Sequence, residues 1–137
     1  MADTVQRVQY FYIDVADKPG EGAQVLRMFQ EAGVNLFAFS SFPKGRRVQI
    51  DFIPTDPVAF KTAAKKAKLK LVGPKTGFLV QGEDRIGVVA EIMVKLADAK
   101  INLTACDAVA AGEGRYGAIL WVKSRDVQKA AKILNAS

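Results

Sequence analysis

An internal repeat with a spacing of 67 residues constrains this fold more than any other sequence feature. The first copy contains a loop, an apolar helical run and an exit segment, which read Asp17-Lys18-Pro19-Gly20 before the run and Gly33-Val34-Asn35-Leu36 after it. The second copy has the same order, with Asp84-Arg85-Ile86-Gly87 before its run and Lys100-Ile101-Asn102-Leu103 after it (84 − 17 and 102 − 35 are both 67). A repeat this long, present twice, indicates two copies of one small module and not a solenoid, whose repeats are shorter and more numerous.

The length and composition limit what each copy can be. The chain has 137 residues, of which 50% are apolar, so it has room for one ordinary domain or two very small ones. Two modules of about 65 to 70 residues would be marginal alone, and we expect them to pack on each other or on a partner. No apolar run approaches the roughly 18 to 20 residues of a membrane span, and the polar N-terminus has no signal-peptide core. These observations predict a soluble, cytoplasmic protein.

The side chains that usually carry catalysis are scarce. The chain has no histidine and a single cysteine, Cys106, which falls in a predicted strand and is expected to be a buried structural thiol. A metal site would have to be built from carboxylates alone, and no spacing brings Asp14, Asp51 and Asp107 together. Heavy-metal-binding domains also need a Cys-x-x-Cys pair. We therefore predict no catalytic residue, metal or cofactor, and a protein that is not an enzyme.

The first copy reads as strand, helix, strand, strand, helix, strand. The strands are predicted at 7–15, 34–42, 46–53 and 68–72, and the third of them has a wet face of Arg47, Gln49 and Asp51. The first helix is predicted to begin with Pro19 in its first turn and to end at Gly33, and the second to begin at Pro57.

The second copy repeats most of this order. Its predicted elements are a strand at 76–81, a helix at 87–99, strands at 101–108 and 116–122, and a helix at 126–134. A final strand, moved by 67 residues, would fall at about 135–139, and the sequence ends at Ser137, so the second module is expected to lack it. The edge beside its first strand then needs cover from another segment or a second chain.

These elements predict an α+β fold of two ferredoxin-like (βαββαβ) modules, each an antiparallel sheet with both helices on one face. The turn Gly73-Pro74-Lys75 marks the boundary, giving a first module of residues 1–73 and a second of residues 74–137. The first two strands carry large apolar side chains on both faces, although two helices can cover only one. We therefore predict that sheet faces pack together, between modules or between the two chains of a homodimer.

The loop at 17–22 is the candidate binding site. A helix N-terminus presents unpaired N–H groups and the positive end of the helix dipole, which favour an anion. Gly20 and Gly22 leave room for a ligand carboxylate, Asn35 is expected beside the loop, and Asp17 could accept from an ammonium. Together these groups would fit the zwitterionic end of an amino acid. The structural alternative is that Asp17 caps the helix, Pro19 starts it and Asn35 is a turn residue.

The pattern Asp-x-Pro-Gly, a helix and then Gly-Val-Asn-Leu, in a module of this topology, resembles an ACT domain, and the chain from about Arg7 to Leu134 resembles a free-standing tandem pair. The resemblance implies a ferredoxin-like fold that binds small molecules, usually amino acids, where modules meet. By position, the implied ligand-binding residues are Asp17, Pro19, Gly20 and Asn35 in the first copy, and Asp84, Gly87 and Asn102 in the second. The chain departs from the family at Ile86, where proline is expected, and in the missing strand.

The function implied is that of a non-catalytic sensor or regulatory protein that acts on a separate partner protein. The alternative is a basic nucleic-acid-binding protein, because RNA-recognition modules share this topology and the formal charge is +6. The basic residues gather in a stretch from Pro57 to Gln81 that has no acidic residue, namely Lys61, Lys65, Lys66, Lys68, Lys70 and Lys75. Against this reading, the third strand places Arg46 and Val48 where the RNA-recognition motif stacks aromatics.

Overall fold

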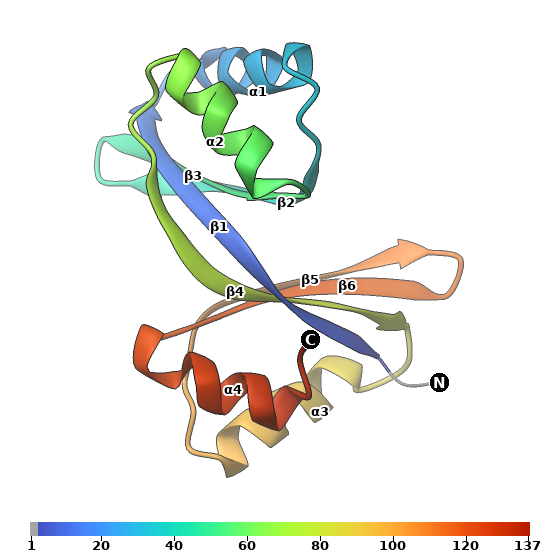
Figure 1. Ribbon diagram of the computed structural model, residues 1–137. Helices are drawn as coiled ribbons and strands as arrows, with labels where there is room; N and C mark the ends of the chain where they lie inside the picture. Colours follow the sequence, from blue (N-terminus) through green and yellow to red (C-terminus); the bar gives the residue numbers. More distant parts are fainter. Residues whose placement is uncertain (1–2) are drawn as a thin grey trace. The chain divides into compact units, whose positions relative to one another are not determined.

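The computed structural model describes residues 3–137. In this part of the chain the elements follow one another as β1 (Thr4–Ala16), α1 (Glu21–Glu31), β2 (Leu36–Lys44), β3 (Arg47–Pro54), α2 (Pro57–Lys66), β4 (Val72–Glu83), α3 (Val88–Asp98), β5 (Leu103–Gly112), β6 (Arg115–Val122), a short 3-10 turn (Ser124–Asp126) and α4 (Val127–Leu134). The pairs β1–β3, β2–β3, β4–β6 and β5–β6 are antiparallel (Figure 1). The predicted α+β class with an antiparallel sheet is confirmed.

The chain forms two compact units. One unit consists of Gln9–Lys75, and the other consists of Thr76–Ser137 together with the N-terminal segment that ends at Val8. The division after Lys75 falls at the turn that the sequence marks as a boundary. The N-terminal segment, which the sequence assigns to the module of residues 1–73, instead groups with the C-terminal unit. Strands β1 and β4 each contribute residues to both units.

In the unit Gln9–Lys75 the strand order is β2-β3-β1-β4, and α1 and α2 lie side by side over one face of these strands (Figure 1). The core under the two helices is aromatic. The rings of Phe29 and Phe60 stack with centroids 4.4 Å apart, and Phe11 lies 5.0 Å from Phe60. Burying each such side chain stabilises the fold by about 1.5 to 3 kcal/mol, so these rings fix α1 and α2 on the sheet.

In the unit Thr76–Ser137 the strand order is β1-β4-β6-β5, with α3 and α4 in contact with each other. Its core is aliphatic apart from Phe78 and Tyr116, and Ile92, Leu96 and Leu120 are among its buried members. The edge beside β4 is covered by the N-terminal part of β1, where the Thr4 hydroxyl donates to the Gln81 carbonyl at 3.3 Å. A segment of the same chain therefore takes the place that the sequence left without a strand.

The 67-residue repeat is reproduced in the helices. The bounds of α1 and α3 differ by 67 at both ends, and their N-caps are Gly20 and Gly87, with φ of 91° and 82°. This left-handed conformation favours glycine, which explains why glycine stands at both positions. The prediction that Pro19 lies in the first helical turn is wrong, because Gly20 caps α1 and Pro19 precedes it.

The second helix follows the expected cap. The Asp56 carboxylate accepts from the N–H groups of Val58 and Ala59 at 3.1 and 3.2 Å, and Pro57 is the first helical residue. Helix α1 has no such side-chain cap. The alternative in which Asp17 caps the first helix is therefore wrong.

Two strand predictions need correction. The predicted strand at 68–72 is absent, because β4 begins only at Val72 and continues to Glu83 through the cis Gly73–Pro74 bond. The wet face predicted for the third strand ends at Gln49, since Asp51 is only 8% exposed. On β2 the side chains of Phe37, Phe39 and Phe42 are 43%, 40% and 42% exposed in the single chain, so their cover by a second sheet face stays a prediction.

Among the described residues, no helix combines the length and apolarity needed to cross a membrane.

Candidate functional site

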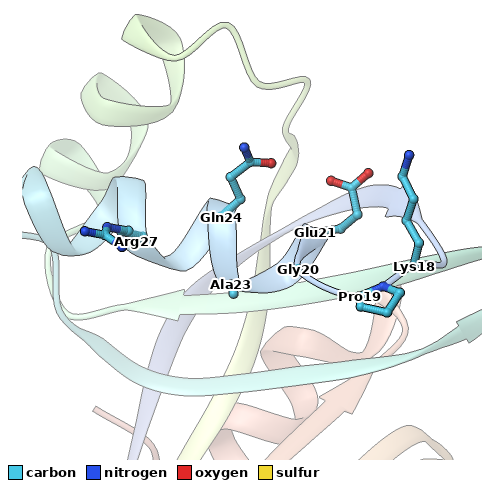
Figure 2. Close-up of a pocket in the computed structure, with 7 residues that line it drawn as sticks. All are labelled: Lys18, Pro19, Gly20, Glu21, Ala23, Gln24 and Arg27. Atoms are coloured by element: carbon cyan, nitrogen blue, oxygen red, sulfur yellow. The ribbon is translucent and has the colours of Figure 1, made fainter.

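A hollow lies at the N-terminus of α1. It is lined by Lys18, Pro19, Gly20, Glu21, Ala23, Gln24 and Arg27, which come from the loop between β1 and α1 and from the first two turns of the helix (Figure 2). The side chains of Lys18, Glu21 and Gln24 extend to the same side of the helix start (Figure 2). Two of the predicted binding residues, Pro19 and Gly20, therefore line one hollow.

The backbone explains how this hollow forms. The Lys18 N–H donates to the Ala16 carbonyl at 3.0 Å, and the Glu21 N–H donates to the Lys18 carbonyl at 3.4 Å, so the loop turns back on itself before the helix starts. A Cβ on Gly20 would meet no atom within 4 Å, so the space above this glycine is open. The N–H groups of the first helical turn have no acceptor within the helix, and the helix dipole adds positive potential.

The charges at the hollow have both signs. Lys18 is an ammonium that suits a carboxylate, and Glu21 is a carboxylate that suits an ammonium. A molecule that carries both groups, such as a free amino acid, matches this pair. Sequence reasoning assigned the acidic role to Asp17 and missed Glu21, although Glu21 directly follows Gly20 and is the first residue of α1.

The other two predicted residues of the first copy do not line this hollow. Asp17 is exposed in the turn before it. Asn35 is exposed between α1 and β2, and its backbone carbonyl accepts from the Thr55 N–H at 3.0 Å and from the Thr55 hydroxyl at 3.3 Å. A ligand role for Asp17 or Asn35 stays a prediction.

The second copy presents a different surface. Asn102 lines a hollow at the C-terminal end of α3, together with Met93, Leu96, Ala97, Lys100, Ile101 and Leu103. Asp84 and Gly87 do not line that hollow, and Ile86, at the position of Pro19, is fully exposed. The residues predicted to bind one ligand in the second copy therefore do not all line this hollow.

Contacts with other residues of the chain hold the loop of the second copy in place. The Asp84 N–H donates to the Gly114 carbonyl at 2.8 Å. The Arg85 guanidinium lies 2.9 Å from a Glu91 carboxylate oxygen and 3.6 Å from an Asp3 carboxylate oxygen. The contact between Asp3 and Arg85 could not be predicted, because nothing in a repeat spacing of 67 relates residue 3 to residue 85.

Asp3 also accepts a hydrogen bond from the Tyr116 hydroxyl at 2.8 Å. Burial, and then this hydrogen bond to a carboxylate, raise the pKa of Tyr116 well above its ordinary value of about 10. Tyr116 therefore stays a neutral donor to Asp3 in neutral and mildly alkaline solution.

No other group of side chains among residues 3–137 indicates chemistry. No three histidine, cysteine, aspartate or glutamate residues in this part of the chain gather as metal ligands would. The Cys106 thiol is half-buried on β5, and burial raises its pKa, which lowers its nucleophilic thiolate fraction. The half-buried position differs only in degree from the buried thiol that the sequence predicts.

No protein-family model matches this chain, and no curated protein matches its sequence. Solved structures do match. Protein BT0572 from Bacteroides thetaiotaomicron has a TM-score of 0.80 at 15% identity, with 97% of this chain and 88% of that chain covered.

Two further matches are regulatory subunits of aspartate kinase. The subunit from Thermus thermophilus, in its ligand-free form, has a TM-score of 0.66 at 18% identity, over 98% of this chain and 95% of that chain. The subunit from Thermus flavus has a TM-score of 0.60 at 18% identity, over 98% and 94%. At these identities the likeness concerns the fold, and at that level the resemblance to the ACT domain is confirmed.

Proposed function

We propose that this protein is a non-catalytic regulatory protein that binds a small molecule, with amino acids as the ligand class, and acts on a separate protein partner. The observation that supports this most is the likeness to the Thermus thermophilus regulatory subunit, because it extends over 98% of this chain and 95% of that subunit. The proposed architecture is a tandem of two ferredoxin-like modules. The N-terminal part of β1 takes the place of the missing last strand in the second module.

The first loop, which we define as residues 17–20, together with the start of α1, is the proposed ligand site. It combines a helix N-terminus, the open space above Gly20, the Lys18 ammonium and the Glu21 carboxylate. These groups match the carboxylate and ammonium of a free amino acid in sign. Asp17, which precedes α1, and Asn35, which follows it, are proposed to contact the same ligand.

The second loop, residues 84–87, is the weaker candidate. Its cation, Arg85, is already engaged by Glu91 and Asp3, whereas no ion pair among the described residues engages Lys18 at the equivalent position. An anionic ligand at Asp84, Gly87 and Asn102 would have to compete with those two carboxylates. We therefore expect the first copy to bind more tightly than the second.

We also propose a cytoplasmic homodimer. The exposed phenylalanines Phe37, Phe39 and Phe42 on the edge strand β2 support it, because such groups on an unpaired edge favour association. Sedimentation equilibrium would show twice the 14.8 kDa of one chain if this is right. A single chain at micromolar concentrations would remove the dimer from the account.

The ligand class is tested by thermal melting of the protein with each of the twenty amino acids and a few nucleotides. A ligand that binds only the folded state at 100 times its Kd adds about 2.7 kcal/mol, which raises the midpoint by on the order of 5 to 10 °C. We expect one amino acid or a related group to do so. A response to nucleotides alone would favour the nucleic-acid alternative.

Matched variants show which of the two copies binds the ligand. Asn35→Ala should reduce the midpoint shift, whereas Asn102→Ala, at the equivalent position of the second copy, should leave most of it. Both positions are exposed, so neither change should unfold the protein. An unchanged shift in Asn35→Ala would exclude Asn35 from the site, and a panel without any response would contradict the proposed ligand class.

A further inference from the structure

Five residues of the C-terminal unit form a cluster that the proposed function does not use. We call it the Asp3 cluster, and it consists of Asp3, Gly82, Arg85, Glu91 and Tyr116. The Asp3 side chain is only 16% exposed although it lies at the start of the described chain. A charged side chain is rarely buried to this degree unless partners hold it.

The partners of Asp3 come from separate elements. One oxygen of its carboxylate accepts from the Tyr116 hydroxyl of β6 at 2.8 Å. The other oxygen lies 3.6 Å from Arg85 in the second loop. The N-terminal segment of β1 is therefore fastened both to a central strand of its unit and to the second loop.

Gly82 leaves the space in which the Asp3 carboxylate sits. A Cβ at Gly82 would collide with the Asp3 carboxylate and would come within 3.1 Å of the Tyr116 ring. The backbone of Gly82 is not in the left-handed region, so any residue could adopt its conformation. The requirement for glycine on β4 is thus a requirement for room for the Asp3 side chain.

Arg85 connects Asp3 to the second loop. It contacts Glu91 on α3 at 2.9 Å as well as Asp3, so its guanidinium joins the helix to the N-terminal segment. The equivalent residue of the first copy is Lys18 (85 − 18 is 67), and it lines the open hollow at α1. The two copies thus use the same loop position in opposite ways.

We propose that Asp3 is a positioning residue: its carboxylate holds Arg85, fastens the N-terminal strand to the C-terminal unit and keeps the second loop closed. We call these contacts of Asp3 the latch, and they do not depend on a ligand. Their consequence for the ligand sites, that the second loop is occupied by an internal carboxylate while the first stays open, rests on the proposed function.

The latch is tested by hydrogen exchange of the full chain, read by mass spectrometry. Asp3→Asn keeps the size of the side chain but removes its charge. Because Asp3→Asn removes the charge that attracts Arg85, we expect amides in residues 84–90 and in the N-terminal strand to exchange about tenfold faster. Amides of the first loop should not change. Unchanged exchange at 84–90 would overturn the proposal.

Two glycines of the same unit give a matched steric test. Gly82→Ala places a methyl group where the Asp3 carboxylate lies, whereas a methyl group at Gly117 on β6 would meet only the Val80 carbonyl, at 3.8 Å. Gly82→Ala should reproduce the faster exchange of Asp3→Asn, and Gly117→Ala should not. Equal effects of the two variants would contradict the role assigned to Gly82.

A double-mutant cycle separates the latch from a general loss of stability. If Asp3 acts through Arg85, Arg85→Gln should speed exchange of the second loop, and Asp3→Asn should add little in that background. Effects that multiply fully would show that Asp3 and Arg85 act independently, and the proposal would fail. This readout needs no ligand, so it can succeed even if the amino-acid panel shows no binding.

Discussion

At the scale of the residue, Tyr116 shows how burial makes a side chain dependable as a donor. Its ring is 4% exposed in the aliphatic core of the C-terminal unit, and its hydroxyl donates to Asp3. Ionisation would place a negative charge in the core and beside a carboxylate, so burial first and the carboxylate second raise the pKa of Tyr116. The sequence could not reveal this pair, because the two residues are 113 positions apart.

The raised pKa of Tyr116 predicts a loss of stability in alkali. In the unfolded chain this tyrosine ionises near pH 10, whereas in the folded protein it keeps its proton to higher pH. The contribution is therefore fully present below about pH 10 and is lost as the pH rises toward the folded pKa, because the folded state binds more protons there. Urea unfolding between pH 8 and 11.5 should show this decline.

Substitution tests whether Tyr116 causes the loss of stability in alkali. Tyr116→Phe removes the ionisable hydroxyl, so its unfolding free energy should be lower at pH 8 but should fall less steeply above pH 10 than that of the natural protein. Tyr12→Phe keeps Tyr116 and serves as the control, with the natural slope. A Tyr116→Phe profile parallel to that of the natural protein would show that another group causes the alkaline loss.

At the scale of the element, the helices could be read from the sequence because their signals are local. Apolar spacing, the Asp56 cap with Pro57 and the glycine after α1 all act within a few residues of the helix they define. The strands were harder to predict. Gly73-Pro74 resembles a break, yet β4 runs through it, and whether a strand face is covered depends on distant segments, as the buried Asp51 shows.

The ends of α1 and α3 differ in one informative way. Each helix is followed by one equivalent backbone hydrogen bond, 2.9 Å long. The Val34 N–H donates to the Phe29 carbonyl after α1, and the Ile101 N–H donates to the Leu96 carbonyl after α3. The residue in the left-handed conformation is Gly33 after α1 (φ 75°) but Lys100 after α3 (φ 60°). A non-glycine residue in this conformation costs about 1 to 2 kcal/mol.

Lys100→Gly should therefore stabilise the protein by about 1 kcal/mol, and Gly33→Lys, its counterpart, should destabilise it by about the same amount. Urea unfolding at pH 7 measures both changes. Lys100→Ala controls for loss of the lysine charge and should not be stabilising. If Lys100→Gly lowers the unfolding free energy, the lysine side chain contributes more at that position than the backbone strain costs.

At the scale of the whole molecule, the chain forms two compact units, and the 67-residue repeat relates the first loop and first helix of one to those of the other. The repeat spacing predicted the loops, the helices and their order. It could not predict that the N-terminal segment groups with the C-terminal unit, or that Asp3 and Glu91 engage Arg85 there. The predicted binding residues were placed by analogy between the copies; Pro19 and Gly20 line the hollow at α1, and Asn102 lines the hollow at α3.

We propose that an amino-acid ligand binds at the first loop. A titration of the ¹⁵N-labelled protein with each of the twenty amino acids, followed by two-dimensional NMR, tests it most directly. We expect one ligand to shift the amides of Gly20, Glu21 and Gln24 well before it shifts Gly87, which is equivalent to Gly20. Shifts centred on the second loop, or no shift with any amino acid at 10 mM, would contradict it.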